Sequence, residues 1–172
     1  MSNTTSHVRN RNGIPETTDE LKILARVSAL CAMDPPLTEI DPKAVTEHVA
    51  SRIHSGVTTQ EIDDLTARYC ATNVTTNLEY ERLAARVVVS DLHKEMDHSF
   101  TETTRSLRTA KALGKLDARY VAFVERHGQI LDMAMKFERD YEYTYFGLQT
   151  LLRAYLLRIG GKVVESPQHM IM

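Results

Sequence analysis

The histidines are the residues of this chain whose type most readily suggests chemistry. His48 and His54 are six residues apart, and His93 and His98 are five apart. Neither spacing places both rings squarely on one helical face, so neither pair predicts a zinc site. The chain also contains no Gly-x-Gly-x-x-Gly fingerprint and no Gly-Lys-Ser/Thr phosphate loop. Spacing alone therefore predicts neither a metal site nor a catalytic site.

The acidic pairs and the cysteines have ordinary structural explanations. Asp19-Glu20 and Asp63-Asp64 lie where helices are expected to begin, and the helix dipole favours acids there. Cys31 and Cys70 fall within predicted helices and are expected to be small core residues. Two cysteines are too few for a disulfide framework, which favours a reducing, cytoplasmic location.

The composition excludes several classes of protein. The 172 residues carry a formal net charge of -2, with 42% hydrophobic and 26% charged residues, as in ordinary globular domains. This charge gives no reason to expect binding to nucleic acid or to an anionic membrane. No apolar run approaches the roughly 20 residues of a membrane helix, and the polar N-terminus is not a secretory signal.

Any site must be positioned by the elements that periodicity and capping predict. Asn12-Gly13 predicts a hairpin turn, in which Pro15 is confined to an edge strand. A helix follows from about Thr18, and Asp41-Pro42 opens a second. Thr58 and Glu61 form a capping box that opens a third, and a fourth is expected over 78–96. The expected inward stripes are Leu21, Leu24, Val27, Leu30, Val45, Val49, Ile53, Ile62, Leu65, Tyr69, Tyr80, Leu83, Val87 and Leu92.

These elements predict two parts. Residues 1–6 read as a disordered tail, and 7–98 as a hairpin with four helices and a core of its own. A polar stretch that begins at Ser99 marks the boundary. Residues 99–172 form the second part, with clear helical segments expected at about 117–127 and 145–159.

The end of the chain carries the most specific pattern. An aromatic ladder over 141–146 leads into Leu-Leu-Arg-Ala-Tyr-Leu-Leu-Arg-Ile, a Gly-Gly turn and Pro-Gln-His-Met. This string resembles the large subunit of class I ribonucleotide reductase, at the point where the catalytic barrel of that family begins. The resemblance implies that the ladder packs against the barrel and that Gln168 and His169 are structural, at the base of its first strand. Because the chain stops at Met172 within an apolar run, we expect a longer enzyme.

Three earlier stretches, 7–13, 55–63 and 83–95, resemble the ATP-cone that opens these subunits. The implied fold is mainly α: a short β-hairpin with a four-helix bundle, followed by the first helices of the barrel domain. Carried over position by position, the resemblance implies an allosteric ATP/dATP site at Asn10, Arg11, Glu16, Thr17, Thr18, Asp19, Glu20, Leu21, Lys22, Thr59, Asp63 and Lys94.

The resemblance also implies roles within this site. Lys22 and Lys94 would bind the phosphates, Thr59 would offer a hydroxyl beside the start of the third helix, and Asp63 would accept from the ribose hydroxyls. The backbone of 16–19 would border the adenine. Each residue has a simpler explanation on its own: a solvated lysine, a capping threonine or a first-turn acid.

The sequence departs from the family pattern in three places, which involve four residues. Asn10 stands in place of a lysine, and Glu20-Leu21 in place of an aromatic or aliphatic residue followed by Asp or Asn. Both departures lie in the implied nucleotide site, and the first removes a phosphate-directed charge. Ser166 stands in place of an arginine outside the cone.

The implied activity belongs to a complete enzyme. That enzyme reduces ribonucleoside diphosphates to deoxyribonucleotides by thiyl-radical chemistry. Its partners would be a small radical-generating subunit, thioredoxin or glutaredoxin, and further copies of the large subunit. This 172-residue piece, without the catalytic cysteines or a metal, should be inactive alone. The alternative is a stand-alone helical nucleotide-binding or interaction module with a degenerate cone.

Overall fold

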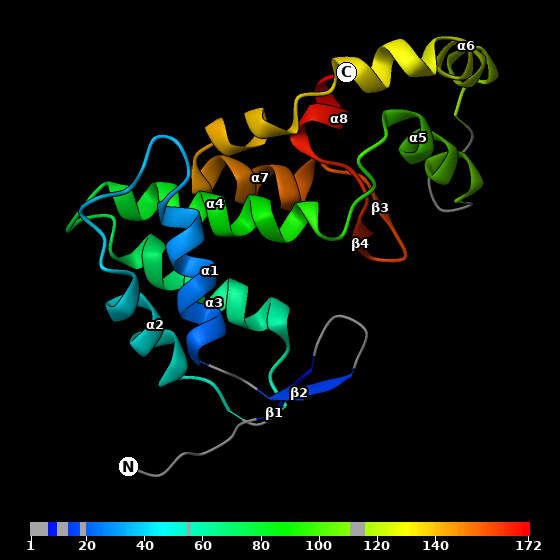
Figure 1. Ribbon diagram of the computed structural model, residues 1–172. Helices are drawn as coiled ribbons and strands as arrows, with labels where there is room; N and C mark the ends of the chain where they lie inside the picture. The colour runs from blue at the N-terminus through cyan, green and yellow to red at the C-terminus, as the bar shows by residue number, and fades with distance from the viewer. Residues whose placement is uncertain (1–6, 10–13, 18–19, 55, 111–115) are drawn as a thin grey trace. The chain divides into compact units, whose positions relative to one another are not determined.

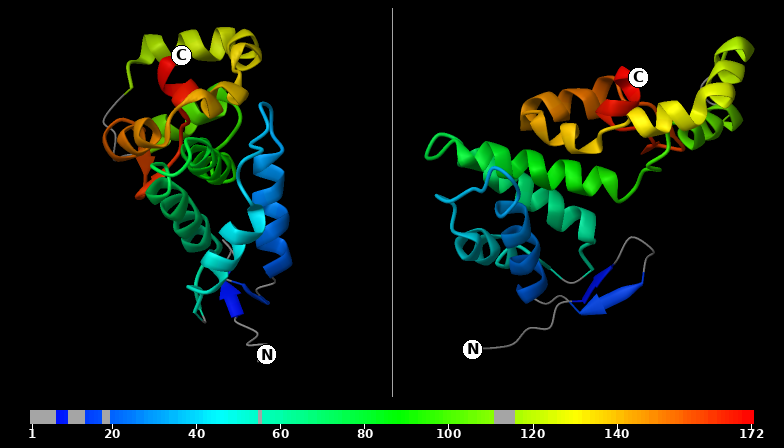
Figure 2. Two further views of the ribbon diagram at one scale, coloured as in Figure 1. Left: turned by 90° about the vertical axis from the view of Figure 1, so that its left-hand side faces the viewer. Right: turned by 45° about the horizontal axis from the view of Figure 1, so that its top comes forward.

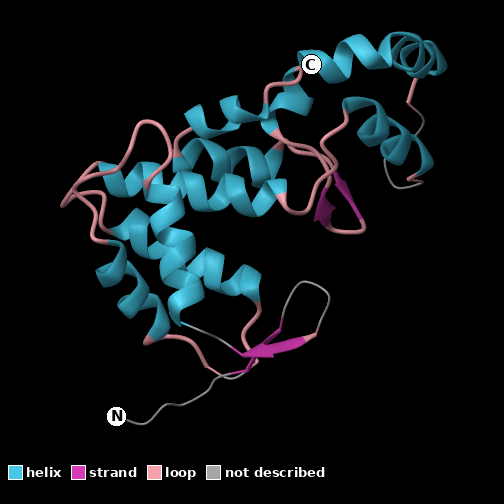
Figure 3. Cartoon of the chain, in the orientation of Figure 1, coloured by secondary structure: helices cyan, strands magenta, loops and turns pink. Residues whose placement is uncertain are grey.

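The computed structural model describes residues 7–9, 14–17, 20–54, 56–110 and 116–172 (Figure 1). Helices dominate, as the sequence predicts, and the strands are short (Figure 3). The chain divides into two compact units, Met1–Val88 and Val89–Met172, and the boundary between them along the chain falls within helix α4 (Glu79–His93). The predicted boundary near Ser99 lies further along the chain, after that helix. No described helix is long and apolar enough to span a membrane.

The first unit opens with the predicted hairpin. Strands β1 (His7–Arg9) and β2 (Pro15–Thr17) pair antiparallel, with Val8 opposite Glu16. The predicted turn at Asn12-Gly13 lies outside the described residues. Val8 is buried, and the Arg9 amide donates to the carbonyl of Val57 at 2.9 Å. The hairpin is thereby attached to the segment that precedes α3 (Thr59–Thr72).

Four helices complete this unit: α1 (Glu20–Cys31), α2 (Pro42–Ala50), α3 and the greater part of α4. The two predicted N-caps are confirmed, whereas Gly56 is not the C-cap of α2. The Asp41 side chain accepts from the Lys43 amide at 2.9 Å, and the Thr58–Glu61 capping box is complete. Gly56, with φ of 92°, lies in the turn before α3, because α2 already ends at Ala50.

The buried face of α1 differs from the predicted one. Ile23, Val27 and Leu30 are buried at a spacing of four and three residues, which places them on one helical face. Leu21 is 68% exposed, so its predicted place in the core is wrong. Among the other expected core residues, six are buried: Val45, Val49, Ile62, Leu83, Val87 and Leu92. Five are only half-buried: Leu24, Ile53, Leu65, Tyr69 and Tyr80.

A buried arginine on α4 hydrogen-bonds to carbonyl groups at the C-terminal end of α1 and in the loop that follows. Arg86 is 4% exposed and donates to the carbonyls of Leu30 at 2.7 Å, Met33 at 3.3 Å and Pro35 at 2.6 Å. The last carbonyls of a helix have no partner within the helix. Arg86 therefore supplies the donors that this turn and the following loop need.

Both cysteines are core residues, as expected. Cys31 and Cys70 are buried, and burial is the main cause that raises the pKa of each thiol, to about 12 for Cys70. Both side chains therefore stay as neutral thiols at ordinary pH.

The second unit contains α5 (Phe100–Thr109), α6 (Ala118–Ala134), the 3-10 helix η2 (Phe137–Glu142) and α7 (Tyr145–Ala154). A hairpin follows, formed by β3 (Arg158–Ile159) and β4 (Lys162–Val163), and α8 (Pro167–Ile171) ends the chain. The helix predicted over 145–159 therefore stops five residues early. Gly160 and Gly161 form the predicted turn, with positive φ values of 58° and 85° that glycine adopts readily.

The strand expected at Gln168 and His169 is helical instead. Ser166 caps α8 by accepting from the Gln168 amide, and Pro167 occupies its first turn. Ser and Pro in this order favour a helix start over a strand. Both residues are tied into the fold: the His169 ring lies 3.2 Å from Thr103 Oγ1, and the Gln168 amide donates to Asp140 at 3.1 Å.

Two small apolar clusters stabilise this unit. One joins Leu92 and Met96 to Leu156, and the other joins Phe100, Val124 and Met135. Within the aromatic ladder, Tyr145 is buried whereas Phe146 is 64% exposed.

Candidate functional site

An ion pair joins α1 to α3 within the first unit. Arg26 Nε donates to Asp63 Oδ1 at 2.7 Å, and Arg26 Nη2 donates to Oδ2 at 2.9 Å. Asp63 is 6% exposed, and the Arg26 side chain is 26% exposed. A bidentate arginine–carboxylate pair is both strong and fixed in orientation. Of the predicted site residues, Asp63 is thus held in a defined position by a partner on another helix.

Two other predicted residues lie one helical turn from this pair. Lys22 precedes Arg26 by four positions on α1, and Thr59 precedes Asp63 by four on α3. Residues four apart lie on the same face of a helix. Lys22 Nζ is also 3.9 Å from a carboxylate oxygen of Glu16 on β2. The first turn of α1, the first turn of α3 and the hairpin therefore meet at one end of the unit, which can be followed in Figure 2.

The start of α3 already holds a carboxylate. Glu61 accepts from the Thr58 amide at 2.7 Å and from the Thr58 hydroxyl at 2.9 Å, while its own amide donates to that hydroxyl at 3.2 Å. The bonds from Thr58 hold the pKa of Glu61 below its ordinary value. The capping box thus uses two of the amides that a phosphate could bind. Fewer amides therefore remain at the start of α3 for a further anion, which would also meet the Glu61 carboxylate there.

The structure does not describe all of the predicted site. Asn10, Arg11, Thr18 and Asp19 lie outside the described residues, and Thr17 ends β2. Glu16, Glu20, Leu21 and Lys22 are exposed, and Thr59 is half-buried. Lys94 is an exposed residue directly after α4, and it belongs to the second unit.

Sequence reasoning missed Arg26. The only available indication was its position, four residues after Lys22 and at the border of the apolar face that Ile23 and Leu30 help to form. A half-buried arginine at such a position needs an acidic partner, and Asp63 was already a candidate residue. Which acid faces which base depends on how α1 packs relative to α3, and the periodicity of one helix does not specify this.

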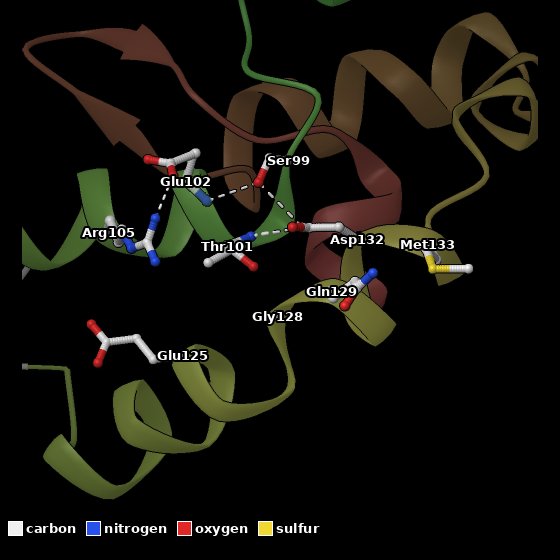
Figure 4. A pocket seen from close by; sticks show the side chains of 9 residues that line it. All are labelled: Ser99, Thr101, Glu102, Arg105, Glu125, Gly128, Gln129, Asp132 and Met133. Carbon is white, nitrogen blue, oxygen red and sulfur yellow. Dashed lines mark hydrogen bonds and ion pairs between the residues drawn. The ribbon is translucent and has the colours of Figure 1, made fainter.

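The second unit contains an open cleft of about 560 Å³ between α5 and α6 (Figure 4). Asp132 of α6 accepts from the Thr101 amide at 3.0 Å and from the Ser99 hydroxyl at 3.2 Å, and so caps α5 from outside. Thr101 Oγ1 is buried and has no hydrogen-bond partner among the described residues. The acidic residues here are paired or capping, and the described part of the chain holds no group of three or more metal-ligating residues.

Comparison with known proteins identifies the first unit. A family model described as the ATP cone domain matches residues 6–95, which include the hairpin and the first four helices. The ribonucleoside-diphosphate reductase large chain of Schizosaccharomyces pombe is 41% identical over 96% of this chain. The corresponding proteins of Neurospora crassa and variola virus are 39% and 38% identical over 96% and 94%.

These matches cover only part of the relatives. The chain spans 21% of the Schizosaccharomyces pombe protein, 18% of the Neurospora crassa protein and 22% of the variola virus protein. The match to the ATP cone domain model, by contrast, covers over half of this chain. The matched part contains the Arg26–Asp63 pair and the capped start of α3. On this match, the chain belongs to the ATP cone domain family.

Proposed function

We propose that this chain is the N-terminal, regulatory part of a ribonucleoside-diphosphate reductase large chain, and that its cone binds ATP or dATP as an allosteric effector. The observation that supports this most is the meeting of β2, the first turn of α1 and the first turn of α3. It brings Glu16, Lys22, Thr59 and Asp63 to one end of the first unit.

The site offers chemically distinct groups to the parts of a nucleotide. Lys22, with Arg11 and Lys94 from the sequence pattern, would bind the phosphates through charge-assisted contacts. Asp63 and Thr59 would hydrogen-bond to the ribose, and the backbone of 16–19 would border the adenine. The carboxylate of Glu61 at the start of α3 supports this order, because it repels phosphate from the α3 side.

The complete enzyme would reduce ribonucleoside diphosphates in the cytoplasm, together with a small radical-generating subunit and a thioredoxin or glutaredoxin. Large-subunit copies would associate. We expect no turnover from the 172-residue chain alone. Cys31 and Cys70 are buried thiols with raised pKa values, which makes them poor nucleophiles for thiol–disulfide exchange.

An NMR titration of the isotopically labelled chain with ATP tests where the nucleotide binds. We expect the largest amide shifts at Lys22, Thr59, Asp63 and Lys94, and little change in α5 and α6. Saturable shifts confined to α5 and α6 would contradict the proposed site.

A further inference from the structure

The short helix α8 begins with a capping box in which a histidine takes the position that Glu or Gln usually occupies. The Ser166 amide donates to Nδ1 of His169 at 3.2 Å, and the Ser166 hydroxyl accepts from the Gln168 amide at 3.2 Å. A helix of this length depends on its cap and its packing, because it contains few hydrogen bonds of its own. The first turn of α8 is therefore held by a side chain that can take up a proton near neutral pH.

The contacts of the imidazole ring fix its protonation state. A backbone amide only donates, so Nδ1 must carry a lone pair, and the proton of the neutral ring lies on Nε2. Nε2 lies 3.2 Å from Thr103 Oγ1 on α5, and this oxygen can accept from it. A proton added at Nδ1 would face the N–H of Ser166 and break their hydrogen bond. The closed start of α8 thus requires a neutral His169.

The ring also lies in surroundings that disfavour a charge. His169 is 4% exposed, and its ring centroid lies 6.2 Å from that of Phe100 on α5 and 5.4 Å from that of Phe137 on η2. Hydration of a charged imidazole at this position would require α8 to move away from its neighbours. The same displacement would release the broken capping box.

The charged and titratable groups around the ring act in both directions. Burial has the largest effect and lowers the pKa of His169 below its ordinary value of 6.5. Asp140 on η2 and Asp97 before α5 favour the charged form, whereas His98 opposes it. Asp140 is also in contact with Nε2 of His93 at 2.8 Å. Because burial dominates, the ring is neutral in the folded protein at neutral pH.

We propose that His169 makes α8 a pH-dependent latch. While the imidazole is neutral, the capping box holds α8 against α5 and η2. When the ring is protonated, the first turn of α8 opens and residues 167–171 separate from these two elements, while α6 and α7 keep their structure. This inference goes beyond the proposed function and does not depend on nucleotide binding, because all of these elements lie in the second unit.

NMR spectroscopy of the isotopically labelled 172-residue chain tests the latch between about pH 7.5 and about pH 5. The shifts of the two ring nitrogens show which of them carries a proton, and the Cα shifts of residues 167–171 report whether α8 is helical. We expect an unprotonated Nδ1 at the upper end of this range. Below pH 6.5 the ratio of open to closed α8 should rise up to about tenfold per pH unit, because opening is linked to the uptake of one proton.

Two variants separate the capping role of His169 from the general effect of acid. His169→Gln keeps an acceptor for the Ser166 amide but does not titrate, so its open-to-closed ratio should change less than about twofold over the same range. His98→Gln is the matched control, because it removes an exposed imidazole that packs against Phe137 and does not cap α8. It should keep the pH-dependent opening.

Three outcomes would overturn the proposal. They are a protonated Nδ1 in wild type at neutral pH, an α8 that opens equally in wild type and in His169→Gln, and a loss of α6 and α7 together with α8. If His169→Gln has no helical α8 even at neutral pH, wild type decides: the Cα shifts of residues 167–171 must follow the protonation of the His169 ring, and a separate pH dependence would contradict the latch.

Discussion

At the scale of single residues, Arg86 is a buried charged residue of the first unit with three hydrogen bonds to main-chain carbonyls. Its guanidinium donates to three carbonyls at the end of α1 and in the loop that follows. Arg86→Met keeps much of the apolar volume but leaves these buried acceptors without their donor. We expect a loss of about 3–5 kcal/mol in the free energy of unfolding. Denaturant unfolding measures it.

The control for this change is Arg82→Met, one turn earlier on α4 at an exposed position. It should change stability by no more than about 0.5 kcal/mol. Similar losses from both variants would contradict the role assigned to the three carbonyl contacts.

His169 makes the stability of the second unit depend on pH. Burial is the main cause that lowers its pKa below the ordinary value of 6.5. Below pH 6.5 the unfolded chain therefore takes up a proton that the folded chain resists, and stability falls as the pH falls. Relative to His169→Gln, wild type should lose up to about 1.4 kcal/mol per pH unit below that value.

Unfolding of both proteins at pH 7, 6 and 5 measures this difference. Glu165 gives the opposite sign, because burial raises its pKa and its contribution falls as the pH rises. The comparison with His169→Gln leaves Glu165 unchanged and so isolates the imidazole. A difference that is constant with pH would contradict the assignment.

At the scale of elements, α5 and α6 are in tight contact at Gly128. A Cβ at this position would lie 2.5 Å from Thr101 Oγ1. Alanine favours a helix over glycine by up to about 1 kcal/mol, but overpacking costs roughly 1–3 kcal/mol. Gly128→Ala should therefore destabilise the chain overall.

Thr101→Ala removes the obstructing atoms together with a buried hydroxyl that has no described partner. The double variant Thr101→Ala/Gly128→Ala should recover most of the loss, with a coupling of at least about 1 kcal/mol in thermal or denaturant unfolding. Strictly additive effects would show that the two side chains do not meet at this crossing.

The helix starts that depend on capping residues could be predicted from the sequence. Asp41-Pro42 and the Thr58–Glu61 box act within four residues, so their sequence suffices. The strand expected at Gln168 was wrong. It was inferred from the resemblance, whereas the neighbouring residues Ser166 and Pro167 encode a helix start. Leu21 and Arg26 could not be assigned from the sequence, because the packing of α1 decides which of its faces is buried and what faces Arg26.

At the scale of the whole molecule, the two halves should differ in their ability to fold. Residues 7–97 contain complete caps and the buried core of the first unit. A chain of residues 99–172 lacks Leu92 and Met96, which pack against Leu156, and His93, which lies 2.8 Å from the buried Asp140. We expect a cooperative thermal melt from 7–97 and none from 99–172.

A third chain, residues 89–172, restores these three residues and serves as the control. It should regain part of the helical signal in circular dichroism. A sharp melt from 99–172 would show that the second part does not need the end of α4.

The central claim is that the cone of this chain binds an adenine nucleotide, and calorimetric titration with ATP tests it most directly. We expect saturable heat at one site per chain. Asn10→Lys should tighten binding about tenfold by restoring a phosphate-directed charge, and Lys94→Ala should weaken it about ten- to hundredfold, since charge-assisted contacts contribute roughly 1.5–3 kcal/mol. An absence of binding heat in wild type that Asn10→Lys does not restore would contradict the claim.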